Sequence, residues 1–178
     1  MSQRNTLIRS LHDVGVAAWF GGSLMGAIGL NGATAEAKDP RERLSLSSVG
    51  WAKWAPVQAG AIAAHAIGGI GLVIANKGRI ATQPEARTNT IVKSVVTIAA
   101  AGVTLYSGIL GTRIAANAGE GAEGVTEPRF GASRELASAQ KQQRILQWTI
   151  PALTLALIVM GAQQGEQQRP LAGLLNRR

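Results

Sequence analysis

The chain has 178 residues, enough for one compact domain, and it contains no cysteine, which excludes disulfides and thiolate metal sites. Its formal net charge of +8 would favour a nucleic-acid partner if the protein were soluble. The basic residues, however, lie between long uncharged segments, where Lys and Arg meet anionic lipid. We therefore expect the lipid bilayer, and no nucleic acid, as a partner.

Four long segments contain no Asp, Glu, Lys or Arg, and they are residues 14–35, 54–76, 94–112 and 145–165. A hydrocarbon core of about 30 Å is crossed by about 20 helical residues, so each segment is long enough to span it. The alternative is a soluble four-helix bundle, which would carry charges along one face of every helix. We therefore predict an all-α integral membrane bundle of four transmembrane helices in a single domain, residues 1–178.

The predicted spans alternate with two long segments on one side of the membrane and a short segment on the other. The spans are residues 12–32, 54–76, 91–113 and 145–164, the outer loops are 33–53 and 114–144, and the inner loop is 77–90. In the second outer loop, residues 119–131 are glycine-rich and predicted to be irregular. Ser133 is a candidate N-cap for a polar helix over 134–145 that continues into the fourth span.

The orientation is predicted from the short loop, because Lys and Arg residues divide equally, nine and nine, between the two sides. Residues 77–90 are basic with one acid, Glu85, which favours the cytoplasmic side. Trp51, Trp54 and Trp148 fall at the opposite face, as an interfacial aromatic belt would. We predict a multi-pass protein of the bacterial plasma (inner) membrane with its N-terminus and C-terminus in the cytoplasm.

The first span also has features of a secretory signal. Arg4 and Arg9 precede an apolar run that ends in Ala33-Thr34-Ala35, an A-x-A pattern typical of signal cleavage. Against cleavage, His12 and Asp13 interrupt the start of the run, and the run is long for a signal. We expect this segment to be a retained span.

Short matches between the two halves raise the hypothesis of a 2+2 internal repeat, with chance similarity as the alternative. Asp39-Pro40-Arg41 is matched by Glu127-Pro128-Arg129, and Trp54-Ala55-Pro56 by Trp148-Thr149-Ile150-Pro151. We expect Pro56 and Pro151 in the first turns of their helices, where a proline loses no hydrogen bond.

Small residues recur at intervals of four on three spans, and they are Ala18, Gly22 and Gly26; Gly60, Ala64 and Gly68; and Ala100, Thr104 and Gly108. Small residues at this spacing let a second helix approach closely and gain van der Waals contact. One interpretation is packing among the four spans. The other is a lipid-facing groove for another membrane subunit or a second copy of the chain.

His65 is predicted to be the ionisable side chain nearest a span centre. It lies 11 residues before Asn76, which places it about 16 Å from the inner end of its span. The same count places Met25 and Tyr106 at a similar depth, with Thr104 and Ser107 nearby. An ionisable group inside a membrane is a functional candidate, whereas the structural alternative is a neutral histidine hydrogen-bonded to Tyr106 or a hydroxyl.

A haem held by two histidines is not expected. His12 is predicted at the inner edge of the first span, about 16 Å from the depth of His65, and axial ligands of one iron must face each other. His65 with Met25 could in principle hold haem or copper, so His65, Met25 and His12 are kept as metal candidates. No cofactor is predicted.

Residues 11–22, Leu-His-Asp-Val-Gly-Val-Ala-Ala-Trp-Phe-Gly-Gly, resemble the first span of copper-resistance D type bacterial membrane proteins, where a His precedes a small-residue run ending in Trp-x-Gly-Gly. The resemblance covers 12 residues. It implies copper handling, with His12, Met25 and His65 as residues to test, or else a shared helix-packing signature. Clusters of Met and His that suit soft-metal transport are absent from the sequence.

Two functional hypotheses remain. No phosphate-binding loop, nucleophile elbow or metal-binding helix motif is present, and no carboxylate lies inside a predicted span, so an enzyme is not favoured. The sequence favours a non-enzymatic helical scaffold or accessory subunit of a plasma-membrane assembly. The alternative is a small transporter or a metal- or haem-handling protein with a mid-membrane site around His65.

Overall fold

The structure is a computed structural model that describes residues 5–167 and the side chains of residues 5–163. Its main elements are helices, and their bounds are α1 Thr6–Met25, α2 Asn31–Ala35, α3 Pro40–Ala75, α4 Lys77–Thr82, α5 Pro84–Ala116 and α6 Arg134–Gln167. A π-helical turn, Gly26–Leu30, joins α1 to α2, and a 3-10 turn, Ala118–Glu120, follows α5. The C-terminus, predicted to be cytoplasmic, lies outside the described residues.

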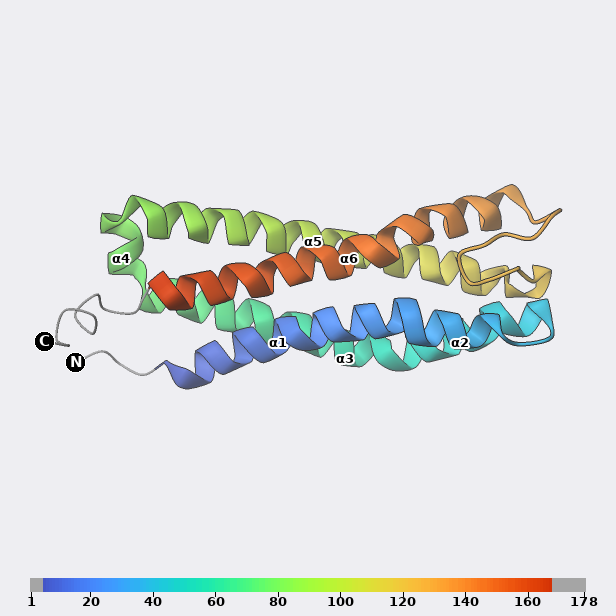
Figure 1. The fold of residues 1–178 in the computed structure, drawn as a ribbon, viewed down its shortest axis with the longest axis horizontal. Coiled ribbons are helices and arrows are strands. Elements are labelled where there is room, and N and C mark those ends of the chain that lie inside the picture. The colour runs from blue at the N-terminus through green and yellow to red at the C-terminus, as the bar shows by residue number, and fades with distance from the viewer. Residues whose placement is uncertain (1–4, 168–178) are drawn as a thin grey trace, which may run out of the picture.

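Four helices are long and apolar enough to cross a bilayer, and they are Thr6–Ala35, Pro40–Ala75, Pro84–Ala116 and Arg134–Gln163. They lie side by side along one long axis (Figure 1). The described part of the chain has no β-strand, only one isolated bridge between Gly124 and Glu127. The predicted all-α bundle of four membrane-spanning helices is confirmed, and the chain is a multi-pass membrane protein.

The helices extend well beyond the uncharged segments, because charged side chains continue a helix once it has left the hydrocarbon core. Most of the predicted outer loop 33–53 is helical, and only residues 36–39 connect α2 to α3. Asp39 is the N-cap of α3, where its Oδ1 accepts a hydrogen bond from the Arg41 amide at 2.9 Å. The inner connection is also mostly helical, since α4 occupies six of its residues.

The second outer loop keeps its predicted form. Apart from the 3-10 turn, residues 117–133 are irregular, and Ser133 Oγ accepts a hydrogen bond from the Leu136 amide at 3.1 Å, which confirms the predicted N-cap of α6. Side chains of the neighbouring helices hold the loop. Arg43 of α3 donates to the Ala122 carbonyl at 3.2 Å, and Gln140 of α6 donates to the Val125 carbonyl at 3.0 Å.

The bundle consists of two helical hairpins. α1 packs along α3, α5 packs along α6, and the hairpins meet mainly where α1 contacts α6, while α3 and α5 touch each other much less. Figure 1 shows α4 and the start of α1 at one end of the bundle, here named the α4 end. α2 and residues 117–133 lie at the other end, here named the loop end.

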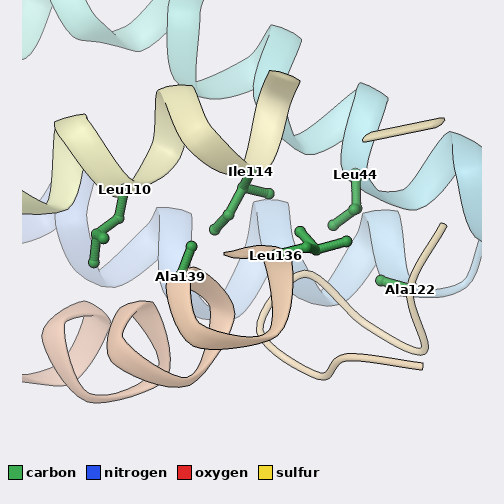
Figure 2. Packing of buried hydrophobic residues seen from close by; sticks show 6 residues of the cluster. All are labelled: Leu44, Leu110, Ile114, Ala122, Leu136 and Ala139. Carbon is green, nitrogen blue, oxygen red and sulfur yellow. The ribbon is translucent and has the colours of Figure 1, made fainter. Parts of the chain in front are cut away.

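Two apolar clusters hold the hairpins together. The first lies at the loop end between α3, α5, α6 and the loop, and it consists of Leu44, Leu110, Ile114, Ala122, Leu136 and Ala139 (Figure 2). The second lies further along the bundle and consists of Trp19, Ala61, Ala100 and Ile150. Trp19 is fully buried, and its indole N–H donates to Thr104 Oγ1 at 3.1 Å, so its one polar group is satisfied.

Gly22 and Gly26 of the first span pack against side chains, not against another helix backbone. A Cβ at Gly22 would collide with the indole of Trp54, and one at Gly26 with the indole of Trp51. Both tryptophans come from α3, so this groove is filled within the chain. Gly60, by contrast, has nothing within 4 Å of where its Cβ would lie.

The remaining small residues divide in the same way. Ala100 is fully buried, Ala64 is half-buried, and Gly108 has open space around its Cβ position. Gly68 packs against the backbone of α1, as described below. The predicted stripe is therefore a set of separate contacts and not one continuous groove.

The two prolines are not in first turns. Pro56 lies inside α3 and Pro151 inside α6, each in the middle of a long continuous helix. The expectation failed because both helices begin outside the uncharged segments, at Pro40 and Arg134. The two prolines occupy nearly equivalent places in their helices, which is compatible with the hypothesis of a 2+2 repeat and does not test it.

Replacing Gly22 and Gly26 together with Leu is expected to destabilise the isolated protein, because overpacking costs about 1–3 kcal/mol per site. Thermal unfolding in mild detergent measures the effect. The control is Gly21→Leu with Gly60→Leu, since neither position has a neighbour within 4 Å of the added Cβ. A Gly22→Leu, Gly26→Leu protein with unchanged stability that fails to associate with a partner would show instead that these glycines serve an intermolecular contact.

Candidate functional site

α1 and α3 cross near the α4 end with their backbones in contact. A Cβ on Gly15 would lie 2.5 Å from the main-chain nitrogen of His65, and a Cβ on Gly68 would lie 2.5 Å from that of His12. Real Cβ atoms do not approach so closely, so glycine is required at both positions. The arrangement is reciprocal, because each helix contributes one histidine and, three residues further along, one glycine that faces the histidine of the other helix.

The two histidines pair across this crossing. His12 Nδ1 lies 3.0 Å from the carbonyl oxygen of His65, and His65 Nδ1 lies 2.9 Å from the carbonyl oxygen of His12. Their rings stack with centroids 4.0 Å apart and an interplanar angle of 19°. His12 is 8% exposed and His65 is 2% exposed. The pair is therefore a buried polar link between two spans.

The hydrogen bonds determine which ring nitrogens carry hydrogen. A carbonyl oxygen only accepts, so both Nδ1 atoms donate, and in a neutral histidine Nε2 is then an acceptor. His12 Nε2 lies 3.5 Å from the Lys93 Nζ, which only donates, and His65 Nε2 lies 3.5 Å from Thr97 Oγ1. Both acceptor nitrogens thus approach side chains of α5.

A cavity of about 550 Å³ lies against the histidine pair, a volume typical of ligand-binding pockets. Its lining comes from the first turns of α1, the last turns of α3, α4, and the first half of α5. It lies between α3 and α5, two helices that share few contacts, and Arg79 and Ile80 of α4 complete its lining. The lining includes His12, His65, Lys93 and Thr97, together with further polar residues of α4 and α5.

Lys93 is the basic residue deepest in this site. It lies nine residues after Pro84, the start of α5, or about 14 Å along the helix. Besides its approach to His12, its Nζ would lie 3.8 Å from a Cβ on Gly161, so the ammonium reaches towards α1 and α6. Asp13, the residue after His12, interacts with Lys93 electrostatically. Lys93 directly precedes the uncharged segment 94–112, at the border of the predicted hydrocarbon core.

The predicted separation of His12 and His65 is wrong. We expected about 16 Å of depth between them, and the rings are stacked at 4.0 Å. The count placed His12 at the very start of the first span, but α1 begins at Thr6, so His12 lies nearly two turns inside it, while α3 ends at Ala75, as expected. The helices are therefore shifted along one another relative to the prediction.

The other predicted neighbours of His65 lie elsewhere. Tyr106 hydrogen-bonds to Gln142, and Ser107 exchanges hydrogen bonds with Gln143, both on α6. Thr104 accepts the indole hydrogen of Trp19. The hydroxyl next to His65 belongs to Thr97. A hydroxyl beside His65 was expected, but it was expected to come from Tyr106, Thr104 or Ser107.

The metal candidates are only partly brought together. Met25 is 65% exposed and lies 13 residues after His12 on α1, about 20 Å along the helix, so it does not join the pair. The histidine rings are stacked face to face, whereas axial ligands of a haem point their nitrogens at each other across the iron. Within residues 5–163, no group of three or more His, Asp or Glu side chains could hold a metal ion.

Sequence reasoning missed Lys93 and Gly15. Lys93 lies two residues inside the predicted span 91–113, where basic side chains commonly reach the membrane surface and need no functional explanation. The available signal for Lys93 was its helical context, since Pro84 is a favoured first residue of a helix and lies nine positions earlier. Gly15 fell outside the spacing of four that selected Gly22 and Gly26.

No protein-family model, curated protein sequence or solved structure matches this chain.

Substitution of the two histidines is expected to be non-additive. His12→Leu and His65→Leu should each lower the free energy of unfolding by about 1–3 kcal/mol, because each removes a buried hydrogen bond and the ring stack. The second substitution removes a stack that is already lost, so the double variant should show a coupling of about 0.5–3 kcal/mol. The control cycle pairs His12→Leu with Ser107→Ala, which should add within about 0.5 kcal/mol. Full additivity in the histidine cycle would contradict the pairing.

Proposed function

We propose that the protein is a non-enzymatic membrane protein that binds a small ligand in the cavity beside the His12–His65 pair. The observation that carries this proposal is a cavity in a membrane-spanning bundle whose lining includes two buried histidines and Lys93. Ligand sites in helical membrane bundles are built in this way, from an apolar pocket with a few converging polar groups.

The sequence alone favoured the other hypothesis, a scaffold or accessory subunit. A scaffold needs contact surfaces, which exposed apolar faces supply, but it has no need for a cavity whose lining includes buried histidines and a lysine. Burying a histidine pair and placing a lysine beside it costs free energy relative to an apolar core. The cavity therefore favours the ligand-handling hypothesis, of which a small transporter is one form.

Copper handling, implied by the resemblance of residues 11–22, remains a separate proposal. It rests on His12 and His65, whose Nδ1–H groups donate to main-chain carbonyls and leave the two Nε2 atoms as the nitrogens able to bind a metal. Lys93 lies 3.5 Å from one of those nitrogens, and its positive charge disfavours a metal cation there. A cytoplasmic α4 end in a bacterial plasma membrane is likewise proposed, from the basic short loop.

Filling the cavity is expected to expel the ligand. Ser94 lines the cavity on α5, and Val95, one residue further, is 60% exposed and lies outside the lining. Native mass spectrometry of protein released from mild detergent should detect a bound small molecule with the wild type and with Val95→Trp, and none with Ser94→Trp. The scaffold hypothesis predicts that a partner polypeptide co-purifies in all three and that the small-molecule content does not differ. That result would overturn the proposal.

A further inference from the structure

The surface of α6 carries a shallow hollow, here named the α6 hollow, at the point where the uncharged segment of this helix begins. Its volume is about 650 Å³, and it is lined by Arg144, Ile145, Trp148, Thr149, Ala152 and Leu153. The small side chains of Thr149 and Ala152 lie between larger ones, which leaves room at the helix surface. Arg144 directly precedes the uncharged segment 145–165, so the α6 hollow begins at the membrane border and continues into the bilayer.

A carboxylate from the outer loop is held beside Arg144. Arg144 Nε lies 3.9 Å from Glu127 Oε1. The carboxylate is fixed by its neighbour, because Thr126 Oγ1 donates to Glu127 Oε1 at 2.8 Å and the Thr126 amide donates to Oε2 at 3.2 Å. One turn before Arg144, Gln140 donates to the Val125 carbonyl at 3.0 Å and holds the loop against α6. A positive and a negative charge therefore lie side by side at the border of the membrane.

Both charged groups remain accessible. The Arg144 side chain is 66% exposed and the Glu127 side chain is 46% exposed. A guanidinium has five N–H donors, and the contact with Glu127 is longer than a hydrogen bond. A carboxylate has about four acceptor positions, and Thr126 donates to two of them. The pair thus has donors for a further anion and acceptors for a further cation at adjacent positions.

We propose that the α6 hollow binds a phospholipid whose headgroup carries a primary ammonium, as phosphatidylethanolamine does. The phosphate accepts hydrogen bonds from the Arg144 guanidinium, and the ammonium donates to the Glu127 carboxylate. An acyl chain lies in the hollow over Thr149 and Ala152, beside the exposed indole of Trp148, a side chain suited to the membrane border. This site is separate from the cavity beside the histidine pair and does not depend on the proposed function.

The chemistry of the pair distinguishes this headgroup from other common ones. A choline headgroup has methyl groups in place of N–H, so it cannot donate a hydrogen bond to Glu127. A glycerol headgroup adds no positive charge to the phosphate, and Glu127 repels the negative charge that remains. Ordinary attraction by a basic side chain has the opposite preference, because it favours a net negative lipid. Lys141 is of this ordinary kind, since it is exposed and lies outside the α6 hollow.

The test is a lipid titration of the full-length protein in an uncharged detergent, followed by native mass spectrometry. The probes are dioleoyl phosphatidylethanolamine, phosphatidylcholine and phosphatidylglycerol, which share their chains. The ethanolamine lipid should bind the wild type about fivefold more tightly than the choline lipid, the factor expected of one charged contact near the surface. Glu127→Gln should abolish this difference. Arg144→Gln should weaken binding of both lipids about fivefold, because both carry the phosphate.

Three controls accompany the titration. Lys141→Gln removes a basic residue three positions from Arg144 and should leave the preference for ethanolamine unchanged. Ala152→Trp fills the hollow and should weaken binding of both zwitterionic lipids, whereas Val159→Trp, at an exposed position of α6 outside the hollow, should not. Stepwise N-methylation of the ethanolamine headgroup needs no variant, and the affinity of the wild type should fall when the last N–H is lost.

Three results would overturn the inference. Equal binding of the ethanolamine and choline lipids to the wild type would show that the headgroup is not recognised. Tighter binding of phosphatidylglycerol than of phosphatidylethanolamine would show that only positive charge attracts lipid here. Undiminished binding to Ala152→Trp would show that the lipid lies outside the α6 hollow.

Discussion

The crossing of α1 and α3 is the contact on which the rest of the site depends. Two glycines bring the backbones together, and at this separation each histidine reaches the main-chain carbonyl of the other, at 3.0 and 2.9 Å. A larger residue at Gly15 or Gly68 would move the helices apart and remove both hydrogen bonds. The crossing also fixes the direction of both rings, so their Nε2 atoms approach α5.

The same crossing accounts for the cavity. α1 packs against both α3 and α6, whereas α3 and α5 share few contacts and leave room between them for the cavity that both helices line. Lys93 and Thr97 reach from α5 towards the histidines across this region. The close packing of α1 against α3 and the cavity between α3 and α5 are therefore two consequences of one arrangement of helices.

The sequence predicted the fold because hydrocarbon thickness sets a strict length for uncharged segments, and four segments meet it. It also predicted the Ser133 cap, since capping depends on residues close in sequence. It did not predict the histidine pair, because the shift of one helix along another depends on where the helices begin. α1 begins at Thr6, six residues before His12 and outside the uncharged segments. Lys93 was missed because it lies two residues inside the predicted span 91–113, where a basic side chain is ordinary.

The stretch that resembles copper-resistance D proteins gains a structural explanation. His12 and Gly15 form the crossing, Trp19 is at the centre of an apolar cluster, and Gly22 receives the indole of Trp54. Each of these residues packs against another helix of the chain. A shared packing signature is therefore sufficient to account for the similarity, and copper handling stays a prediction that it does not require.

The protonation pattern of the histidines tests the account most directly, and the chain contains only two histidines. Nitrogen-15 magnetic resonance of the protein in detergent or nanodiscs distinguishes a ring nitrogen that carries hydrogen from one that does not. Both residues are expected to be neutral, with hydrogen on Nδ1 and none on Nε2, and His12→Leu assigns the remaining signal to His65. Hydrogen on Nε2 of either residue, or rapid exchange between the two forms, would contradict the reciprocal pair.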